Sequence, residues 1–576
     1  MSNHVVAPTS EPGAGVASRG RDCGAWLGFA LALPPLLMLV HKFWFVIDDA
    51  FISFRYARNL AGGHGLRYNL TENPPVEGYS NFLWTLVCAA YERLGLDMTF
   101  WPPLTGTLCG VALLALVARR IRALEIRGPA AVLAVLSLGC FPPFAVWCST
   151  GLEAMAFALL VFLTFDRLVL APDRPDAIGG GCCAVLLAMV RVEGVAWCVV
   201  IFALATLSRA VAGQWRASAV RLLVAAAIFA ALFGVYFAWR YAYFDTLIAN
   251  TALAKGGFLW SRLPRGLAYV GSFWLTFLTP VLIVPGALLA FRKPRRAVGL
   301  AVAAMALAFP AYAIAVTGDF MPMGRFLLPG LPFAAILTGW LLTDLASLGR
   351  AVGSLLCVAF GLVVVALGVM PAFNVHVAPR SALESLRFRF NTPKFMTEVE
   401  QWADQRDNAA NWSATGRALR AYVAARRPDE PNPSIVMGAI GAAGYYSNLH
   451  VYDRHGLVTP RVARRPVDER EPILSAGHDK RVPAEFFLDD RPTILEYRLL
   501  QRGGPRAAIE AARAAAQSLR QDARRVPALD RYVVDVFVPS DDRESCLIVT
   551  VRLPEGQPTE QAWAEFQRRL SELAGR

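Results

Sequence analysis

The alternation of apolar runs with short polar connections along the chain predicts a bundle of membrane-spanning helices. The first run, residues 25–47, is long enough to cross a bilayer, which takes about 20 apolar residues in a helix. Further runs of similar character follow, so we expect about eleven transmembrane helices in total. The later runs lie at residues 101–118, 129–148, 153–171, 177–190, 194–208, 221–238, 266–291, 297–316, 326–344 and 351–371.

One apolar run, residues 80–96, is short and contains Glu92 and Arg93, so we expect an interfacial or re-entrant helix there. If this run crossed the bilayer as well, every later connection would change sides and three basic connections would lie outside the cell. Cytoplasmic connections normally carry the excess of Lys and Arg, which favours the first topology. The three basic connections are residues 119–127, 209–221 and 292–296.

The two ends of the chain differ from its apolar middle. Residues 1–24 are polar and rich in Gly, Ser and Pro, which predicts a disordered cytoplasmic segment before the transmembrane domain at residues 25–374. In residues 375–576, short apolar runs alternate with helical patterns, which predicts a soluble α/β domain on the extracytoplasmic face. Its expected strands are at residues 435–441, 450–454, 493–497, 532–538 and 547–553, and its expected helices at residues 507–519 and 560–570.

Composition agrees with a multi-pass membrane protein, because the chain is 55% hydrophobic and only 18% charged. The formal net charge of +13 comes from arginines in the short connections and in the C-terminal region. Positive-inside topology and anionic lipid headgroups explain this charge better than nucleic acid does. Most of the ten cysteines lie in apolar runs, and the sequence has neither a disulfide framework nor a zinc-binding spacing.

Two adjacent carboxylates, Asp48 and Asp49, lie where the first apolar run ends. Ionised carboxylates are costly close to hydrocarbon, so a pair at this position suggests a function, although it could also be a solvated pair at a helix end. With the basic connections inside the cell, other polar clusters share the outer face with this pair. Several carboxylates and cations beside the headgroup layer suit a substrate with a phosphate head and a lipid tail. These clusters lie at residues 151–153, 191–193, 240–255 and 319–325.

Several segments resemble a known family. Residues 48–85 (DDAFISFRYARNLAGGHGLRYNLTENPPVEGYSNFLWT) are similar to the first external loop of the GT-C class of polyprenyl-phosphate-dependent glycosyltransferases. The similarity is greatest to the branch that contains the mycobacterial terminal β-(1→2) arabinofuranosyltransferase. Ala249 and Thr317 stand where that family often has Pro and Gly, and neither change removes a charged group. Further blocks resemble the same branch in the same order: WCSTGLE (147–153), RVEG (191–194), RYAYF (240–244), NT (250–251) with Lys255, GDFMPMGRF (318–326), GAAGYYS (441–447), DRHGL (453–457) and GHDK (477–480).

The resemblance implies an integral membrane enzyme of the bacterial inner membrane whose catalytic loop is residues 48–79. It would move a sugar, D-arabinofuranose by the nearest branch, from a polyprenyl-phosphate donor to a glycan or cell-envelope acceptor. Asp48 or Asp49 would be the general base. Arg240, Lys255 and Arg325 would bind the donor phosphate, whose oxygens gain negative charge as the lipid leaves. The residues implied to bind the sugar or the acceptor are Arg55, Arg58, Glu77, Tyr79, Glu153, Glu193, Asn250, Asp319, Tyr445, Asp453 and His478.

Simpler roles are open for several of these side chains, and a divalent cation is a further option for the carboxylates. Intramembrane and loop charges often form structural pairs, and aromatic residues often mark the membrane interface. On this basis Glu153 could cap a helix, Arg191 could pair with Glu193, Asp319 could pair with Arg325, Tyr79 could be an interfacial aromatic and His478 could be a surface residue.

Other functions are also open for the whole chain. A transferase of the same class could use another polyprenyl-linked sugar for lipopolysaccharide or protein glycosylation. A transporter should contain an internal repeat, and we find none in the sequence. A non-catalytic envelope-assembly protein would tolerate the loss of both Asp48 and Asp49. Gly438, Gly441 and Gly444 have GxxGxxG spacing, which is not a dinucleotide-binding fingerprint.

Overall fold

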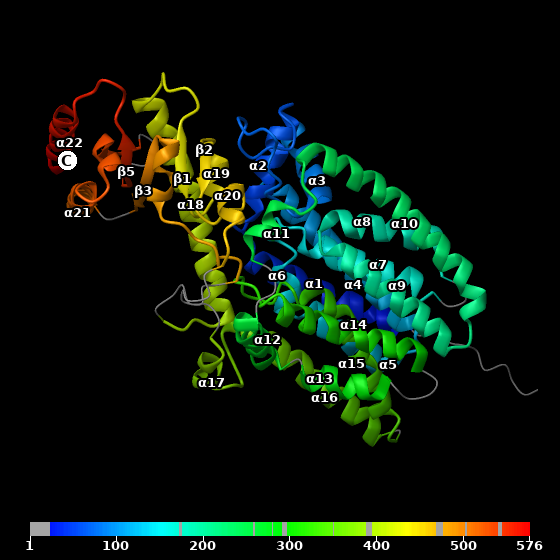
Figure 1. The fold of residues 1–576 in the computed structure, drawn as a ribbon. Helices are drawn as coiled ribbons and strands as arrows, with labels where there is room; N and C mark the ends of the chain where they lie inside the picture. Colours follow the sequence, from blue (N-terminus) through cyan, green and yellow to red (C-terminus); the bar gives the residue numbers. More distant parts are fainter. Residues whose placement is uncertain are drawn as a thin grey trace, which may run out of the picture.

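The structure, a computed structural model, consists of a helical bundle with a smaller sheet-containing domain at one end (Figure 1). It describes residues 23–171, 175–256, 260–278, 280–290, 296–349, 351–387, 394–467, 476–501, 504–539 and 544–575. The predicted disordered segment lies outside the described residues except for Cys23 and Gly24. Most of the third basic connection, residues 292–295, also lies outside them.

Seven of the described helical segments are long and apolar enough to cross a membrane, so the chain is a multi-pass membrane protein. Shorter apolar helices complete the bundle: α5 (Gly128–Gly139), α7 (Ala154–Leu168), α8 (Ala177–Val190) and α13 (Pro280–Ala290). The seven longer segments are α1 (Gly24–Lys42), α4 (Trp101–Ala123), α9 (Gly194–Val211), α10 (Trp215–Phe244), α14 (Arg296–Ala315), α15 with the 3-10 turn before it (Leu328–Ala346) and α16 with the 3-10 turn after it (Val352–Phe373).

Two of the predicted spans are broken in the structure. The run at 129–148 forms α5 and a separate short helix, α6 (Pro142–Val146), because Pro142 and Pro143 have no amide N–H to continue the ladder of α5. The run at 266–291 forms α12 (Leu263–Phe277) and α13, and the chain turns at Leu278 with a left-handed φ of 51°.

The run at 80–96 forms α3 (Phe82–Arg93), whose 12 residues are too few to cross a bilayer. This helix packs against α2 (Ala50–Ala61), which follows the Asp48–Asp49 pair. The two short helices lie at the end of the bundle nearest the sheet domain (Figure 1).

The C-terminal domain contains the five predicted strands and both predicted helices. Its sheet has the order β2-β1-β3-β5-β4, with parallel pairing from β2 to β3 and antiparallel pairing from β3 to β4. Helix α18 (Glu398–Arg426) packs on one face of the sheet and α21 (Gly504–Ala523) on the other. The remaining elements are β1 (Ser434–Met437), α19 (Ala442–Ser447), β2 (His450–Asp453), α20 (Pro460–Ala463), β3 (Ile494–Leu500), β4 (Tyr532–Phe537), β5 (Cys546–Arg552) and α22 (Thr559–Ala574).

The buried side chain of Arg55 on α2 joins the first loop to the sheet domain. Its guanidinium donates to the carbonyl of Gly444 at 2.8 Å, to that of Leu449 at 2.6 Å and to that of Tyr68 at 3.0 Å. A Cβ at Gly444 would overlap the Tyr68 hydroxyl, so only glycine allows this approach. Residues 48–79 therefore pack as part of the domain interface.

We predict that Arg55→Met lowers the stability of this interface. The change removes a charged donor from three buried carbonyls, and a hydrogen bond to a charged group contributes about 1.5–3 kcal/mol. Thermal unfolding in detergent should occur at a clearly lower temperature for Arg55→Met than for wild type. Arg93→Met is the matched control, because Arg93 is exposed at the end of α3. Equal unfolding temperatures for the two variants would contradict the assignment.

Candidate functional site

A cavity of about 1510 Å³ lies where the helical bundle meets the C-terminal domain. It is larger than the roughly 300–1,000 Å³ of a typical small-molecule site. Its walls come from the α1–α2 connection, the α8–α9 connection, the segment after α14 and loops of the sheet domain. His455 and His478 of the sheet domain line the cavity opposite the bundle. The charged residues that line its bundle side are Asp48, Asp49, Arg191, Glu193, Lys255, Asp319 and Arg325.

The two adjacent aspartates differ in their contacts. The Oδ1 atom of Asp48 accepts a hydrogen bond of 2.8 Å from the amide of Ala442, at the start of α19. A Cβ at Gly441 would overlap the backbone of Asp48, which explains the glycine at this position. Within the described residues, the side chain of Asp49 makes no hydrogen bond or ion pair, and Asp49 lines the cavity. Asp48 is thus a contact to the sheet domain, whereas the carboxylate of Asp49 is available to a ligand.

Burial raises the pKa of both carboxyl groups. Loss of solvation raises the pKa of Asp48 to about 7, against the hydrogen bond from Ala442 and with a smaller contribution from the charge of Asp49. Loss of solvation also raises the pKa of Asp49, while the positive charges of Arg325 and Lys255 oppose it. Both carboxyl groups are therefore better proton acceptors near neutral pH than exposed aspartates are.

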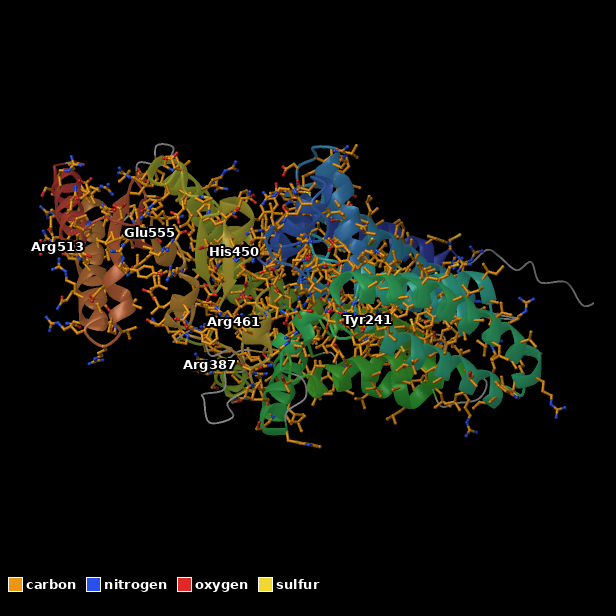
Figure 2. The ribbon with its side chains drawn as sticks, turned by 45° about the horizontal axis from the view of Figure 1, so that its top comes forward. Tyr241, Arg387, His450, Arg461, Arg513 and Glu555 are labelled. Carbon is orange, nitrogen blue, oxygen red and sulfur yellow. The ribbon has the colours of Figure 1, made fainter. Side chains whose placement is uncertain are left out.

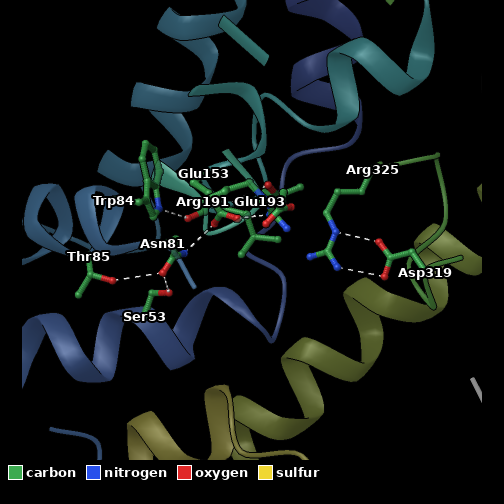
Figure 3. A network of polar contacts seen from close by, with 12 residues as sticks. Ser53, Asn81, Trp84, Thr85, Glu153, Arg191, Glu193, Asp319 and Arg325 are labelled. Carbon is green, nitrogen blue, oxygen red and sulfur yellow. Dashed lines mark hydrogen bonds and ion pairs between the residues drawn. The ribbon is translucent and has the colours of Figure 1, made fainter. Parts of the chain in front are cut away.

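Two cations lie in the same part of the cavity. Lys255 follows α11 (Asn250–Ala254), and no hydrogen bond or ion pair of its ammonium occurs in the described part of the chain. Arg325 is buried and pairs bidentately with Asp319, at 2.8 and 3.0 Å (Figure 3). Lys255 is thus free to meet an anionic group, and Arg325 brings a fixed positive charge to the cavity wall.

A buried polar network supports the wall beside these cations (Figure 3). Arg191 donates to Glu193 at 2.6 Å and also pairs with Glu153. The amide of Asn81, just before α3, donates to the other oxygen of Glu153 at 2.7 Å. The hydroxyl of Ser53 on α2 donates to the side-chain oxygen of Asn81 at 3.0 Å. The network therefore connects the first loop to the α8–α9 connection.

Several predicted site residues lie outside the cavity lining. Arg240 forms a buried pair with Glu77 at 2.5 Å and donates to the carbonyls of Thr246 and Leu247. The ring of Tyr79 packs edge-on against that of Tyr56, with 4.8 Å between ring centroids. These side chains hold the end of residues 48–79 against α10.

Arg55, Arg58 and Tyr445 also lie outside the lining, in the contact between α2 and α19. Arg58 donates to the carbonyl of Tyr445 at 2.8 Å. The Tyr445 hydroxyl donates to Glu92 of α3 at 2.7 Å. The contacts of all three side chains connect α2, α3 and the sheet domain.

Asp453 and Asn250 shape a turn of the sheet domain that borders the cavity. The carboxylate of Asp453 accepts from the amides of His455 and Val458, and burial raises its pKa to about 6. The side-chain amide of Asn250 donates to the carbonyls of Gly456 and Leu457, both at 2.7 Å. The turn thereby connects α11 to the sheet domain.

The same turn brings His455 to the cavity, a residue absent from the sequence-predicted site. Its ring meets that of His478 edge-on, with 4.8 Å between centroids. His455 lies inside the DRHGL block, so its proximity to a predicted residue was the available signal. In the described residues, no group of three or more His, Cys, Asp and Glu side chains is arranged to hold a metal ion.

Comparison with known proteins identifies the fold. The crystal structure of ArnT from Cupriavidus metallidurans bound to undecaprenyl phosphate matches with a TM-score of 0.54 at 14% identity, covering 91% of this chain and 97% of that chain. The structure of the same protein in the apo state matches at 0.49 and 13% identity, with the same coverage. The first likeness shows that this chain has an ArnT-like GT-C fold with a C-terminal sheet domain.

Sequence comparison gives less information. Residues 399–543, from α18 to a point between β4 and β5, match a family described as a domain of unknown function, DUF8728. No curated protein matches the chain. The match covers most of the sheet domain, without β5 and α22, and none of the cavity residues of the bundle.

We predict that Arg191→Met destabilises the protein by about 3–5 kcal/mol. The substitution leaves Glu153 and Glu193 buried beside each other without their cation, and breaking a buried pair has a cost of this size. Chemical unfolding of the purified protein in detergent measures the change. The triple variant Arg191→Met, Glu153→Gln, Glu193→Gln should recover part of the lost stability. No recovery would show that lost packing, not unpaired charge, causes the effect.

Proposed function

We propose that this protein is a membrane glycosyltransferase that moves a sugar from a polyprenyl phosphate to an extracytoplasmic acceptor. The observation that carries the proposal is the carboxylate of Asp49, which is free of hydrogen bonds within the described residues and shares a cavity with Lys255 and Arg325. The fold adds support, since the ArnT structure of the same fold is bound to undecaprenyl phosphate.

In this mechanism Asp49 is the general base. An acceptor hydroxyl attacks the anomeric carbon, its proton passes to the Asp49 carboxylate, and the bond from the anomeric carbon to phosphate breaks. The bonding electrons leave with the polyprenyl phosphate. Asp48 is a positioning residue, because its contact with Ala442 fixes the backbone that carries Asp49.

The leaving phosphate gains negative charge, and fixed cations stabilise such charge best when they are already in place. Lys255 supplies an ammonium that is unpaired among the described residues, and Arg325 supplies a charge whose orientation Asp319 fixes. We assign the donor phosphate to these two residues. Arg240 has a different role, since its guanidinium is used by Glu77 and by two carbonyls.

The remaining predicted ligands form two groups, those that line the cavity and those that do not. Glu193, Asp319 and His478 line the cavity and are the candidates for contact with sugar hydroxyls. The other predicted ligands act indirectly in this proposal, by holding the cavity walls. They are Arg55, Arg58, Glu77, Tyr79, Glu153, Asn250, Tyr445 and Asp453.

D-Arabinofuranose is the proposed sugar, on the resemblance of residues 48–85 and the later blocks to the arabinofuranosyltransferase branch. The cavity is proposed to face outward from a bacterial inner membrane. Helix α10 supports this membrane orientation, because its 30 residues span about 45 Å and end at Phe244 beside the first loop. The basic connection at 209–221 therefore lies at the far end of the bundle, where cytoplasmic arginines are expected.

We predict that Asp49→Asn lowers sugar transfer by about 10²–10⁴-fold, the usual contribution of a general base. Membranes containing the protein are supplied with decaprenyl-phospho-arabinofuranose and arabinan acceptors, and product is quantified. Asp48→Asn is the matched variant, because asparagine keeps the oxygen that accepts from Ala442. It should retain most of the transfer. Undiminished transfer by folded Asp49→Asn would exclude Asp49 as the base.

We also predict an acid limb in the pH profile of transfer. The base must be ionised, and burial raises the pKa of Asp49, so the rate should increase with pH through a midpoint above the value near 4 of an exposed aspartate. In Asp48→Asn the limb should persist, because Asp49 is the group that ionises in this mechanism. If Asp48→Asn removes the acid limb, the group that ionises along it is Asp48 and not Asp49.

A further inference from the structure

The cavity does not end at the candidate catalytic residues but continues along the sheet domain, past His455, to β3 and α21. Glu496 and Arg498 of β3 line this extension and lie two residues apart, so they share one face of the sheet. Their register partners on β5, Thr550 and Ile548, line it as well. The extension is therefore a groove between this face of the sheet and α21.

Small side chains on α21 leave the groove open. One face of this helix carries only small side chains over more than two turns. These residues, at helical spacing, are Ala511, Ala514, Ala515 and Ser518. Large aliphatic side chains at these positions would close the space against β3. Asp522, one turn beyond Ser518, adds a carboxylate at the end of this face.

The charges along the groove are balanced. Among the described residues, three arginines and three carboxylates line it, so a polyanion or a polycation would meet as much repulsion as attraction there. In the described part of the chain, the side chains of Arg481, Glu485, Glu496 and Arg498 make no hydrogen bond or ion pair, although they border one cavity. Their donors and acceptors remain available to a ligand. The six residues are Arg454, Arg481, Glu485, Glu496, Arg498 and Asp522.

We propose that this groove, between β3 and α21, binds an uncharged oligosaccharide acceptor of several sugar units. Such a chain offers hydroxyl groups that donate to carboxylates and accept from guanidinium groups, which matches the mixed lining. The size of the cavity also exceeds the volume expected for a single small ligand. The inference rests on the proposed function for the direction of the chain, since the groove opens toward Asp49.

The groove extends the site from the reacting hydroxyl to units farther along the acceptor. Units bound near Glu496 and Arg498 contribute to affinity without contacting the reacting atoms. Acceptor length should therefore affect kcat/KM, and the effect should depend on these two side chains.

Binding is measured in the Asp49→Asn background, so that no product forms. The probes are an uncharged six-unit arabinofuranosyl oligosaccharide and the same oligosaccharide carrying two phosphate groups. Titration calorimetry on the purified protein in detergent should give tighter binding of the uncharged probe. Adding Glu496→Ala and Arg498→Ala should weaken this binding at least tenfold.

A second variant, Ala514→Trp, fills the groove without removing a charge and should weaken binding similarly. The matched control is Arg513→Ala with Glu555→Ala. It removes one arginine and one glutamate that are exposed, lie in the sheet domain apart from the bundle (Figure 2) and do not line the cavity. Unfolding temperatures equal to wild type confirm that each variant folds.

A kinetic measurement in the active protein tests the same point. The ratio of kcat/KM for the six-unit acceptor to that for a one-unit acceptor should fall at least tenfold in Glu496→Ala, Arg498→Ala. The control variant should keep the wild-type ratio.

The outcomes separate this inference from the proposed function. If binding depends on the groove but the active protein transfers no sugar, the groove binds an oligosaccharide and the proposed reaction is wrong. If transfer occurs and the groove variants bind and react like wild type, the reaction is supported and the groove is not the acceptor site. No binding of the uncharged probe, or tighter binding of the phosphorylated one, would also overturn the inference.

Discussion

The structure depends on the contact by which the first loop of the bundle is fixed to the C-terminal domain. Arg55 donates to carbonyls of the sheet domain, and Asp48 accepts from the first amide of α19. Gly441 and Gly444 allow the backbones to approach closely enough for these bonds. Because the cavity has walls from both parts, it exists only while this contact is intact. Asp49 is thereby held at the junction, where it lines the cavity.

Charge compensation explains how so many ionisable groups can lie at one edge of a membrane domain. Most buried charges near the cavity are paired, as in Arg191 with Glu153 and Glu193, and Arg325 with Asp319. Unpaired buried charge is costly, so a site can leave only a few groups uncompensated. Asp49 and Lys255 are those groups in the proposed mechanism, one for the acceptor proton and one for the donor phosphate. The paired residues set the electrostatic field in which Asp49 and Lys255 act.

The two halves of the cavity fit the two halves of a transfer reaction. The bundle side combines a free carboxylate with cations, which suits a phosphate leaving group. The side formed by β3 and α21 combines balanced charges with small side chains, which suits an uncharged polyhydroxyl chain. The apolar helices lie in the bundle, and the sheet domain lies at its end (Figure 1). In the proposed reaction, a lipid-linked donor and a soluble part of a glycan approach the same carboxylate from different directions.

The sequence by itself determined the elements of this protein. Hydrophobic periodicity gave the order of the apolar helices, the non-crossing helix at 80–96 and all five strands, because burial against lipid or a core selects apolar residues with a fixed period. Polar blocks between the apolar runs contain some of the residues that line the cavity, such as Asp49 and Lys255, and others that lie outside the lining, such as Arg240. Apolar residues continue through the breaks after Gly139 and at Leu278, so hydrophobicity alone did not mark them.

Only the tertiary structure decided which charged groups are free. Asp48 and Asp49 are adjacent and identical in type, yet one is bound by Ala442 and the other is not. Arg240 and Arg325 both look like phosphate ligands in the sequence. Arg325 lines the cavity, whereas Arg240 lies outside the lining and pairs with Glu77, 163 positions away along the chain. His455 reaches the cavity because Asp453 and Asn250 shape its turn. Pairing of this kind depends on distances between segments far apart in the chain, which no local pattern of residues encodes.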